Sequence, residues 1–134
     1  MGHAFEMLSG QIIEAALCVH RELGPGFLES VYESAMKVAL CHRGIVFQSQ
    51  HPVTIFFEGE EVGDHRLDLI VDGQIVVELK AVKALESIHF AQVKSYLKAT
   101  RLGVGLLFNF NAPTLVIKRV VLSDQGPPAI EFES

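Results

Sequence analysis

Residues 67–80 read LDLIVDGQIVVELK, and this stretch decides the fold of the chain. Apolar residues occupy every odd position from Leu67 to Val71 and from Ile75 to Leu79, which is the alternation typical of two half-buried strands. Asp72-Gly73 between them is a turn signal. The stretch therefore predicts an antiparallel hairpin with one apolar face.

The length of the connection follows from the requirement that both apolar rows face one core. A two-residue turn at Asp72-Gly73 would place the two rows on opposite faces of the sheet. A three-residue connection keeps them on one face, and it can consist of residues 71–73 or of residues 72–74. We favour residues 71–73, because Gly73 would then take the left-handed position of a bulged turn.

In either register the opposite face of the hairpin collects Asp68, Glu78 and Lys80. Two neighbouring carboxylates repel each other, and hard oxygen ligands with open positions suit Mg²⁺ or Mn²⁺, which would relieve that repulsion. Lys80 is placed to orient or deprotonate a water, or to stabilise negative charge as it develops. The alternative is an exposed ion pair between Glu78 and Lys80 on a solvated face. The apolar Ile70 and Val76 on the same face favour a covered site.

The segments around the hairpin predict an α/β (α+β) domain with a mixed central sheet flanked by helices. Apolar residues recur at helical spacing in residues 8–22, with Ser9 as a candidate N-cap, in residues 28–43, with Gly44 as the stop, and in residues 84–100. Strand-forming runs occupy residues 52–57, 62–71, 74–81, 103–110 and 114–122. The expected order is ααβββαββ, and the first three strands should form an antiparallel meander.

The length of 134 residues predicts a single domain, residues 1–134, with residues 123–134 as a C-terminal tail. No run of about 18 apolar residues occurs, which argues against a membrane span. Cys18 and Cys41 are too few for a disulfide scaffold, which indicates a cytoplasmic protein. Each cysteine and its neighbouring histidine project in different directions from a helix, so a structural zinc site is not expected.

The formal net charge of -5 argues against non-specific binding to nucleic acid, which depends on Lys and Arg neutralising phosphates. A nucleic-acid partner would therefore need a local basic patch or bound metal ions. A solvated helix face is the simpler explanation of the basic residues near the third helix. The candidates for such a patch are Lys83, His89, Lys94, Lys98 and Arg101.

The order of these motifs resembles the PD-(D/E)XK nuclease superfamily: Asp68, then Glu78-Leu79-Lys80 on the next strand, then a helix with Gln92 and Tyr96. The Gln-x-x-x-Tyr helix is typical of its RecB-like branch. Residues 26–32, GFLESVY, match the GxxExxY motif that names a small bacterial and archaeal family within it. The resemblance extends over about residues 8–121 and departs from the usual pattern at Leu67, which replaces the customary proline before the aspartate.

The resemblance implies a restriction-endonuclease-like core and a nuclease that hydrolyses phosphodiester bonds of DNA or RNA by metal-activated water. Asp68, Glu78 and Glu29 would be its metal ligands, Mg²⁺ or Mn²⁺ its cofactor, and Lys80 its catalytic lysine. Glu33 lies one helical turn after Glu29 and is the alternative ligand. Without the family pattern, Glu29 is equally well explained as a first-turn acid that interacts with the helix dipole.

Gln92 and Tyr96 lie four residues apart on one helical face, so both can point toward the same sheet edge. Gln92 is a candidate to fix Lys80 or a substrate phosphate, and Tyr96 to cap the site. A polar residue and a half-buried aromatic joining helix to sheet explain the pair equally well. Arg66 shares the face of Asp68 by strand alternation, so it could orient that side chain, contact phosphate or form an ordinary cross-strand ion pair.

A second function compatible with the sequence is a non-catalytic nucleic-acid-binding or protein-assembly module that keeps the nuclease fold. The acidic net charge favours it, as does the shortness of the chain, which would leave no room for a separate recognition domain. A homodimer is expected because many enzymes with this core bind their substrates as dimers.

Overall fold

The computed structural model describes residues 2–122 and 129–133. The elements follow the expected order with one strand added. They are α1 (Gly2–Leu23), α2 (Glu29–His42), β1 (Phe47–Phe57), β2 (Glu60–Val71), β3 (Ile75–Lys80), α3 (Ser87–Thr100), β4 (Val104–Asn109), β5 (Val116–Val121) and β6 (Ala129–Glu133).

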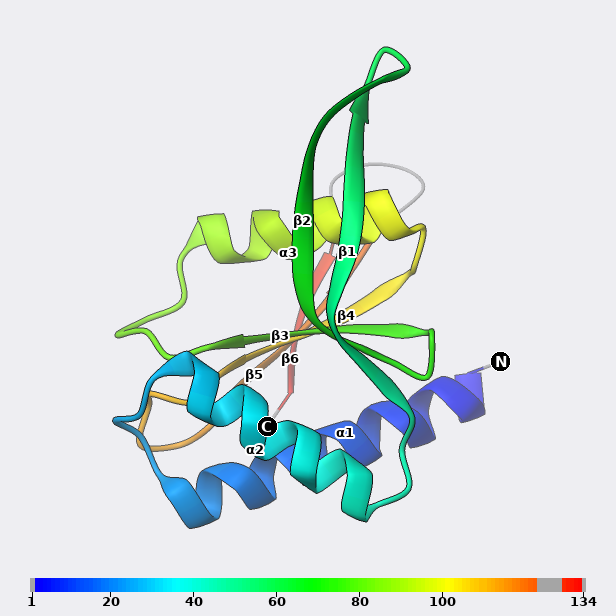
Figure 1. The fold of residues 1–134 in the computed structure, drawn as a ribbon. Helices are drawn as coiled ribbons and strands as arrows, with labels where there is room; N and C mark the ends of the chain where they lie inside the picture. Colours follow the sequence, from blue (N-terminus) through cyan, green and yellow to red (C-terminus); the bar gives the residue numbers. More distant parts are fainter. Residues whose placement is uncertain (1, 123–128, 134) are drawn as a thin grey trace.

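One six-stranded mixed sheet, in the order β1-β2-β3-β4-β5-β6, forms the centre of the molecule. Neighbouring strands are antiparallel except β3 and β4, which are parallel because α3 crosses back between them. Helices α1 and α2 cover one face of the sheet and α3 covers the other (Figure 1). The predicted α/β domain with a mixed sheet between helices is confirmed.

The first two helices differ from the prediction mainly at their ends. We expected Ser9 to be the N-cap of the first helix. Helix α1 begins instead at Gly2, so Ser9 is a buried residue inside the helix. Helix α2 ends at His42, and Gly44, the predicted stop, follows the C-cap Arg43 with a φ of +69°. The backbone N–H groups of Gly44 and Ile45 donate to the carbonyl oxygens of Cys41 and Leu40, which satisfies the last turn.

The register of the central hairpin differs from the one we favoured. Val71 pairs with Ile75, so the connection consists of residues 72–74 and not of residues 71–73. The favoured register assumed that only Gly73 would be left-handed, but Asp72 (φ +53°) and Gly73 (φ +64°) both are. A turn with two left-handed central residues has the twist that antiparallel strands require, and Asp is among the few residues that tolerate this conformation.

The alternation of β1 and β2 is interrupted halfway along both strands, which the sequence did not reveal. Leu69 packs on the α1–α2 side of the sheet, but Leu67 packs on the α3 side. On β1, Phe47 lies on the α1–α2 side and Val53 on the α3 side. Beyond the interruption the β1–β2 hairpin rises away from the other strands (Figure 1). Strand alternation therefore cannot be carried across Asp68, and the expected common face of Leu67 and Leu69 is wrong.

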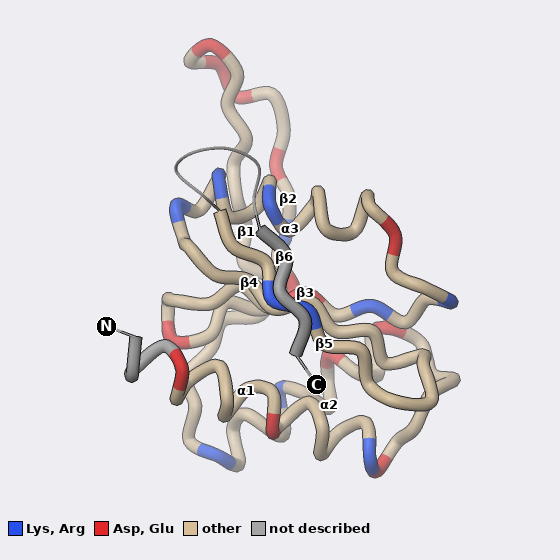
Figure 2. The backbone as a smooth tube through the Cα atoms, turned by 180° about the vertical axis from the view of Figure 1, so that it is seen from behind, with Lys and Arg blue, Asp and Glu red and all other residues tan. Residues whose placement is uncertain are grey.

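The far end of this hairpin is acidic and partly apolar. Figure 2 shows it as a stretch with several acidic positions. These acids are Glu58, Glu60, Glu61 and Asp64, and all of them are exposed. Phe56, Phe57 and Val62 are also exposed there. The hairpin thus carries negative charge well outside the core.

Two expectations concerned the ends and surface of the chain. Residues 129–133, which we expected in a tail, form β6 and pair with β5, while residues 123–128 and 134 lie outside the described residues. Among the helices of the described part, none combines the length and the apolar character needed to cross a membrane.

Candidate active site

Asp68 and Glu78 face each other where the β2–β3 ladder ends, one step beyond the pair Leu69–Val77. The backbone N–H of Asp68 donates to Glu78 Oε2 at 3.1 Å, and the backbone N–H of Leu79 donates to Asp68 Oδ2 at 2.9 Å. Each carboxylate thus accepts a hydrogen bond from the opposite strand in place of a backbone carbonyl. The predicted convergence of the two acids is present in the structure.

Both carboxyls are poorly solvated, and this changes their protonation. Burial raises the pKa of Glu78 to about 8, and the adjacent Asp68 adds to the shift. Burial also raises the pKa of Asp68 to about 6; the hydrogen bond from Leu79 N–H opposes this rise, while Glu33 and Glu29 add to it. A cation between the two acids would favour their charged forms.

Lys80, at the end of β3, is half-buried and lowers the pKa of both Asp68 and Glu78 by its positive charge. Glu78 has only 5% of its surface exposed, and its hydrogen bond comes from the β2 backbone. These two observations disagree with the alternative of an exposed Glu78–Lys80 ion pair on a solvated face. The ammonium of Lys80 is therefore near enough to both acids to favour their charged forms.

Helix α2 brings two further carboxylates toward this pair. Glu29, its first residue, is exposed and raises the pKa of both Asp68 and Glu78. Glu33 is half-buried and raises the pKa of Asp68. Gln50 Nε2 donates to both carboxylate oxygens of Glu33, at 2.9 and 3.1 Å. Glu33 is therefore held by β1, whereas Glu29 acts on both buried acids.

The GxxExxY segment is the structural support of Glu29. The hydroxyl of Tyr32 donates to Gly24 O at 2.6 Å and accepts a hydrogen bond from the N–H of Phe27 at 3.1 Å. Gly26 has a φ of +111°, which favours glycine, and its N–H donates to Asn111 Oδ1. The glycine and the tyrosine of the motif thus shape the loop from which α2 starts. From the sequence, the glutamate of the motif was the residue expected to act in the site, and no role was predicted for its glycine or its tyrosine.

On α3, Tyr96 is brought to the site, whereas Gln92 makes no hydrogen bond to the residue predicted to contact it. Burial raises the pKa of Tyr96 to about 12, and the charges of Glu78 and Asp68 contribute to the rise. Gln92 is half-buried one turn earlier, and its amide makes no hydrogen bond to Lys80 or to another described residue. The proposed contact of Gln92 with Lys80 is thus absent from this structure.

His65 is a residue of this region that the sequence reasoning missed. Its ring stacks on that of Tyr96, with centroids 4.3 Å apart and an interplanar angle of 15°. Burial lowers its pKa, and the charge of Lys80 lowers it further. Strand alternation would place a residue three positions before Asp68 on the opposite face, so no signal in the sequence pointed to His65.

The basic residues considered as phosphate contacts either form ordinary hydrogen bonds within the protein or are exposed or half-buried at the surface. Arg66 donates through a guanidinium nitrogen to the backbone oxygen of Gln50 at 3.2 Å and makes no ion pair with Asp68, so the expected contact between these two side chains is not made in the structure. His89 Nδ1 accepts a hydrogen bond from the N–H of Glu86 and caps the start of α3. Exposed side chains in this set are Lys83, Lys98 and Arg101, and Lys94 is half-buried.

The donor set of the site fits a hard divalent cation that keeps several waters. Within residues 2–122 and 129–133, no three His, Cys, Asp or Glu side chains lie close enough to hold a metal by themselves. The structure instead brings two carboxylates into direct proximity, with Glu29 within electrostatic range. Mg²⁺ and Mn²⁺ are commonly bound by one or two carboxylates together with waters and substrate phosphates.

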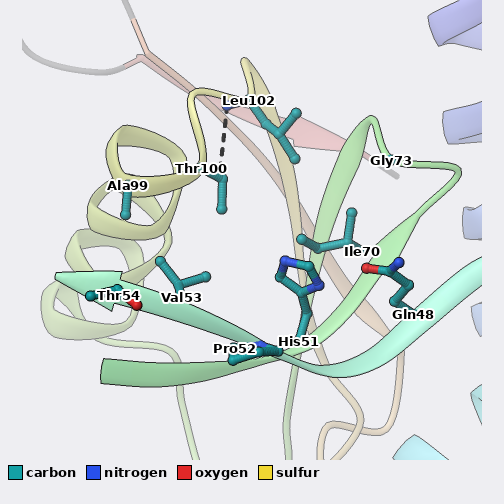
Figure 3. A pocket seen from close by; sticks show the side chains of 10 residues that line it. All are labelled: Gln48, His51, Pro52, Val53, Thr54, Ile70, Gly73, Ala99, Thr100 and Leu102. Carbon is teal, nitrogen blue, oxygen red and sulfur yellow. Dashed lines mark hydrogen bonds between the residues drawn. The ribbon is translucent and has the colours of Figure 1, made fainter. Parts of the chain in front are cut away.

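A separate cavity of about 370 Å³ lies between β1 and the C-terminal end of α3 (Figure 3). Gln48, His51 and Ile70 face it, and near its rim the N–H of Leu102 donates to Thr100 Oγ1 at 3.3 Å. None of the expected catalytic or metal-binding residues lines it. The carboxylate pair therefore belongs to a different part of the surface.

Comparison with known proteins identifies the family of the chain. A family model described as the PD-(D/E)XK nuclease superfamily matches residues 6–120, a span that contains both acids of the pair, Lys80, the α2 glutamates and the Gln92–Tyr96 helix. No curated protein and no solved structure matches the chain.

Proposed function

Because this chain belongs to the PD-(D/E)XK nuclease superfamily, we propose that it is a divalent-metal-dependent nuclease that hydrolyses phosphodiester bonds of DNA or RNA. The observation that carries the proposal is the pair of cross-strand hydrogen bonds, from Asp68 N–H to Glu78 and from Leu79 N–H to Asp68, that holds a buried and a half-buried acid side by side. The charge of Lys80 acts on both acids. Surplus buried negative charge at this position is costly without a cation. We also assign the chain to the GxxExxY family within the superfamily, on residues 26–32.

In this proposal Asp68, Glu78 and Glu29 hold Mg²⁺ or Mn²⁺. The ion would act as a Lewis acid that makes a water more acidic and offsets the charge of the phosphate. Lys80 orients the attacking water and stabilises the negative charge that develops on the phosphate oxygens. Tyr96 closes the α3 side of the site, and Gln92 binds a substrate phosphate.

Cleavage of labelled single- and double-stranded DNA and RNA, with Mn²⁺ or Mg²⁺, tests this function. We expect Lys80→Ala to lower the rate by about 100-fold or more, as for loss of a group that assists proton transfer. Lys83→Ala is the matched control, because Lys83 is an exposed lysine three residues later. Cleavage that survives Lys80→Ala, or no cleavage of any of these substrates, contradicts the proposal.

A second candidate is a non-catalytic nucleic-acid-binding or assembly module with the same fold. It is favoured by the net charge of -5 and by the acidic end of the β1–β2 hairpin. Calorimetric titration with Mn²⁺, compared with Asp68→Asn, separates the two candidates: tight metal binding without cleavage favours the module. Sedimentation in the same buffers tests the homodimer that we propose for either function.

We propose the cytoplasm as the compartment of the protein. The support is that Cys18 and Cys41 are free cysteines in the structure, one of them exposed, which suits a reducing environment. Fractionation of cells that express the tagged chain tests this location, and recovery with secreted or membrane fractions contradicts it.

A further inference from the structure

Gln50 has a backbone conformation that its position in the fold does not explain. Among the described residues, four that are not glycine have a positive φ: Gln50, Glu58, Asp72 and Arg101. Glu58 and Asp72 lie in hairpin turns, and Arg101 is the left-handed C-cap of α3. Gln50, with a φ of +51°, lies within strand β1. Strained residues of this kind persist where the surrounding structure requires them, and they cluster at functional sites.

Gln50 lies directly across from Asp68, at the interruption of the β1–β2 ladder. The pairs Ser49–Leu69 and His51–Leu67 flank the interruption on either side. Gln50 on β1 and Asp68 on β2 thus lie opposite each other. At this position the inward-facing residues of both strands change from the α1–α2 side of the sheet to the α3 side. The left-handed distortion of β1 is therefore located at the carboxylate pair, whereas the register shift between Ile55 and Phe56 lies farther along the hairpin.

The side chain of Gln50 ties α2 to this step. Its amide nitrogen donates to both carboxylate oxygens of Glu33, at 2.9 and 3.1 Å. Its backbone oxygen accepts a hydrogen bond from Arg66, the residue two positions before Asp68. Glu33 lies four residues after Glu29, so the two glutamates share one face of α2. One residue thus links the helix that carries Glu29 to both strands beside Asp68.

Without this link, repulsion would oppose the observed arrangement. Glu29, Glu33, Asp68 and Glu78 are four acids around one site, and Lys80 is the cation that acts on the central two. A carboxylate that lies near other acids needs hydrogen-bond donors to stabilise its charge. The side-chain amide of Gln50 supplies such donors to Glu33. The N-terminal turn of α2 can then approach the pair.

We propose that Gln50 is a positioning residue. Its two hydrogen bonds to Glu33, which we call the clasp, hold the N-terminal turn of α2, and with it Glu29, in place for the divalent cation. This inference rests on the proposed metal-dependent function. Gln50 itself touches neither the cation nor the substrate. The glutamates of α2 accordingly have different tasks, with Glu29 as the ligand and Glu33 as the acceptor of the clasp.

The substitution Gln50→Gly tests the proposal, because it removes the amide while leaving a residue that adopts a positive φ without strain. We expect the free energy of unfolding in urea without metal to be unchanged or higher. We expect the affinity for Mn²⁺, measured by calorimetry, to fall about 10-fold, the loss typical of an outer-shell partner of a metal ligand. Gln50→Asn keeps an amide and tolerates a positive φ, so it should restore part of the affinity.

Two controls make the result specific. Glu58→Gly relieves the same kind of backbone strain in the exposed hairpin turn and should leave Mn²⁺ affinity unchanged. The double variant Gln50→Gly with Glu33→Ala should bind Mn²⁺ no more weakly than Gln50→Gly alone, because both substitutions break one contact.

The outcomes separate this inference from the proposed function. If Asp68→Asn abolishes Mn²⁺ binding but Gln50→Gly does not weaken it, Gln50 does not position the site, and the nuclease proposal stands. If Gln50→Gly lowers stability and leaves affinity unchanged, its role is structural only, and the inference is wrong. If Asp68→Asn binds Mn²⁺ as tightly as the unaltered chain, the proposed metal site is wrong, and so is the positioning role of Gln50 that depends on it.

Discussion

The ring of Tyr32 stacks on that of Phe110, with centroids 4.6 Å apart and an interplanar angle of 13°. Tyr32 comes from α2 and Phe110 follows β4, so the stack joins the start of the helix to the sheet. Its hydroxyl at the same time holds the backbone of Gly24 and Phe27. The tyrosine of the GxxExxY motif therefore acts on the site through the loop that precedes Glu29.

Tyr32→Phe keeps the stack and removes only the hydroxyl. We expect the free energy of unfolding to fall by about 1 kcal/mol, because a partly buried carbonyl and a backbone N–H lose their partner. Urea denaturation followed by circular dichroism measures this. Thr54→Ala, at an exposed position of β1, is the control and should change stability by less than about 0.5 kcal/mol. Equal stability of Tyr32→Phe and the unaltered chain contradicts the role of the hydroxyl.

The raised pKa values of Asp68 and Glu78 predict how stability depends on pH when no metal is present. The ordinary pKa values of these groups are 3.8 and 4.5, and in the folded chain they are about 6 and about 8. The folded chain thus binds more protons than the unfolded one over this range, so stability falls as pH rises. The contribution of the pair is complete below about pH 4 and is lost as pH rises through 6 to 8.

Urea denaturation in a chelator at about pH 5 and about pH 9 checks this dependence. The double variant Asp68→Asn with Glu78→Gln should show a smaller decrease in stability between the two pH values. Added Mn²⁺ should stabilise the unaltered chain more at the higher pH, where the acids are ionised. A pH dependence that is the same in the double variant would show that other groups cause it.

Gly105 has no room for a side chain, because α3 packs closely on β4. A Cβ at this position would lie 2.7 Å from Cγ1 of Val93, a short and branched side chain of α3. We expect Gly105→Ala to lower the free energy of unfolding by about 1–3 kcal/mol through overpacking. Gly103→Ala is the matched control, since a Cβ there meets nothing within 4 Å. A Gly105→Ala chain as stable as Gly103→Ala would contradict the close packing.

The acidic end of the β1–β2 hairpin should limit binding of nucleic acid. Replacing Glu60 and Glu61 by lysine removes repulsion of phosphates, so we expect tighter binding of non-specific DNA with a steeper dependence on salt. Both residues are exposed, and stability should change by less than about 0.5 kcal/mol per substitution. Fluorescence anisotropy over a salt series measures the affinity.

The control for the hairpin makes the same change of charge on another surface. Glu14 and Glu22 are exposed residues of α1, and their joint replacement by lysine should affect DNA binding less. If both double variants gain affinity equally, only the total charge matters, and the position of the hairpin has no special role.

Much of the site could be predicted because it depends on short-range alternation within one hairpin. The spacing of Asp68, Glu78 and Lys80 predicted their convergence on one face. The structure brings the two acids together, and the charge of Lys80 acts on both of them. The exact register could not be predicted by the same reasoning. It depends on a left-handed conformation of Asp72, whereas the prediction allowed that conformation only to glycine. Local backbone preference was therefore a weaker guide than the matching of apolar rows.

The interruption at Gln50 and Asp68 could not be predicted from sequence, for a related reason. Strand alternation assumes that every residue is extended, and nothing in the identity of Gln50 indicates a positive φ. The face predicted for Leu67 was therefore wrong, although those for Leu69 and Val71 were right. The clasp between Gln50 and Glu33 joins residues 17 apart in the chain, which no local pattern marks.

The hydrogen bonds that Glu78 accepts from the N–H of Asp68, and Asp68 from the N–H of Leu79, give each acid a structural role besides its chemistry. The backbone pairing of β2 and β3 ends at Leu69–Val77, and beyond it each carboxylate accepts a hydrogen bond from a backbone N–H of the opposite strand. Truncating either side chain to alanine would strip a backbone amide of its acceptor, so a loss of activity could then stem from a frayed strand end. The substitutions Asp68→Asn and Glu78→Gln remove the charge but keep a side-chain oxygen that can accept the hydrogen bond from the backbone N–H, so they leave the end of the strand intact.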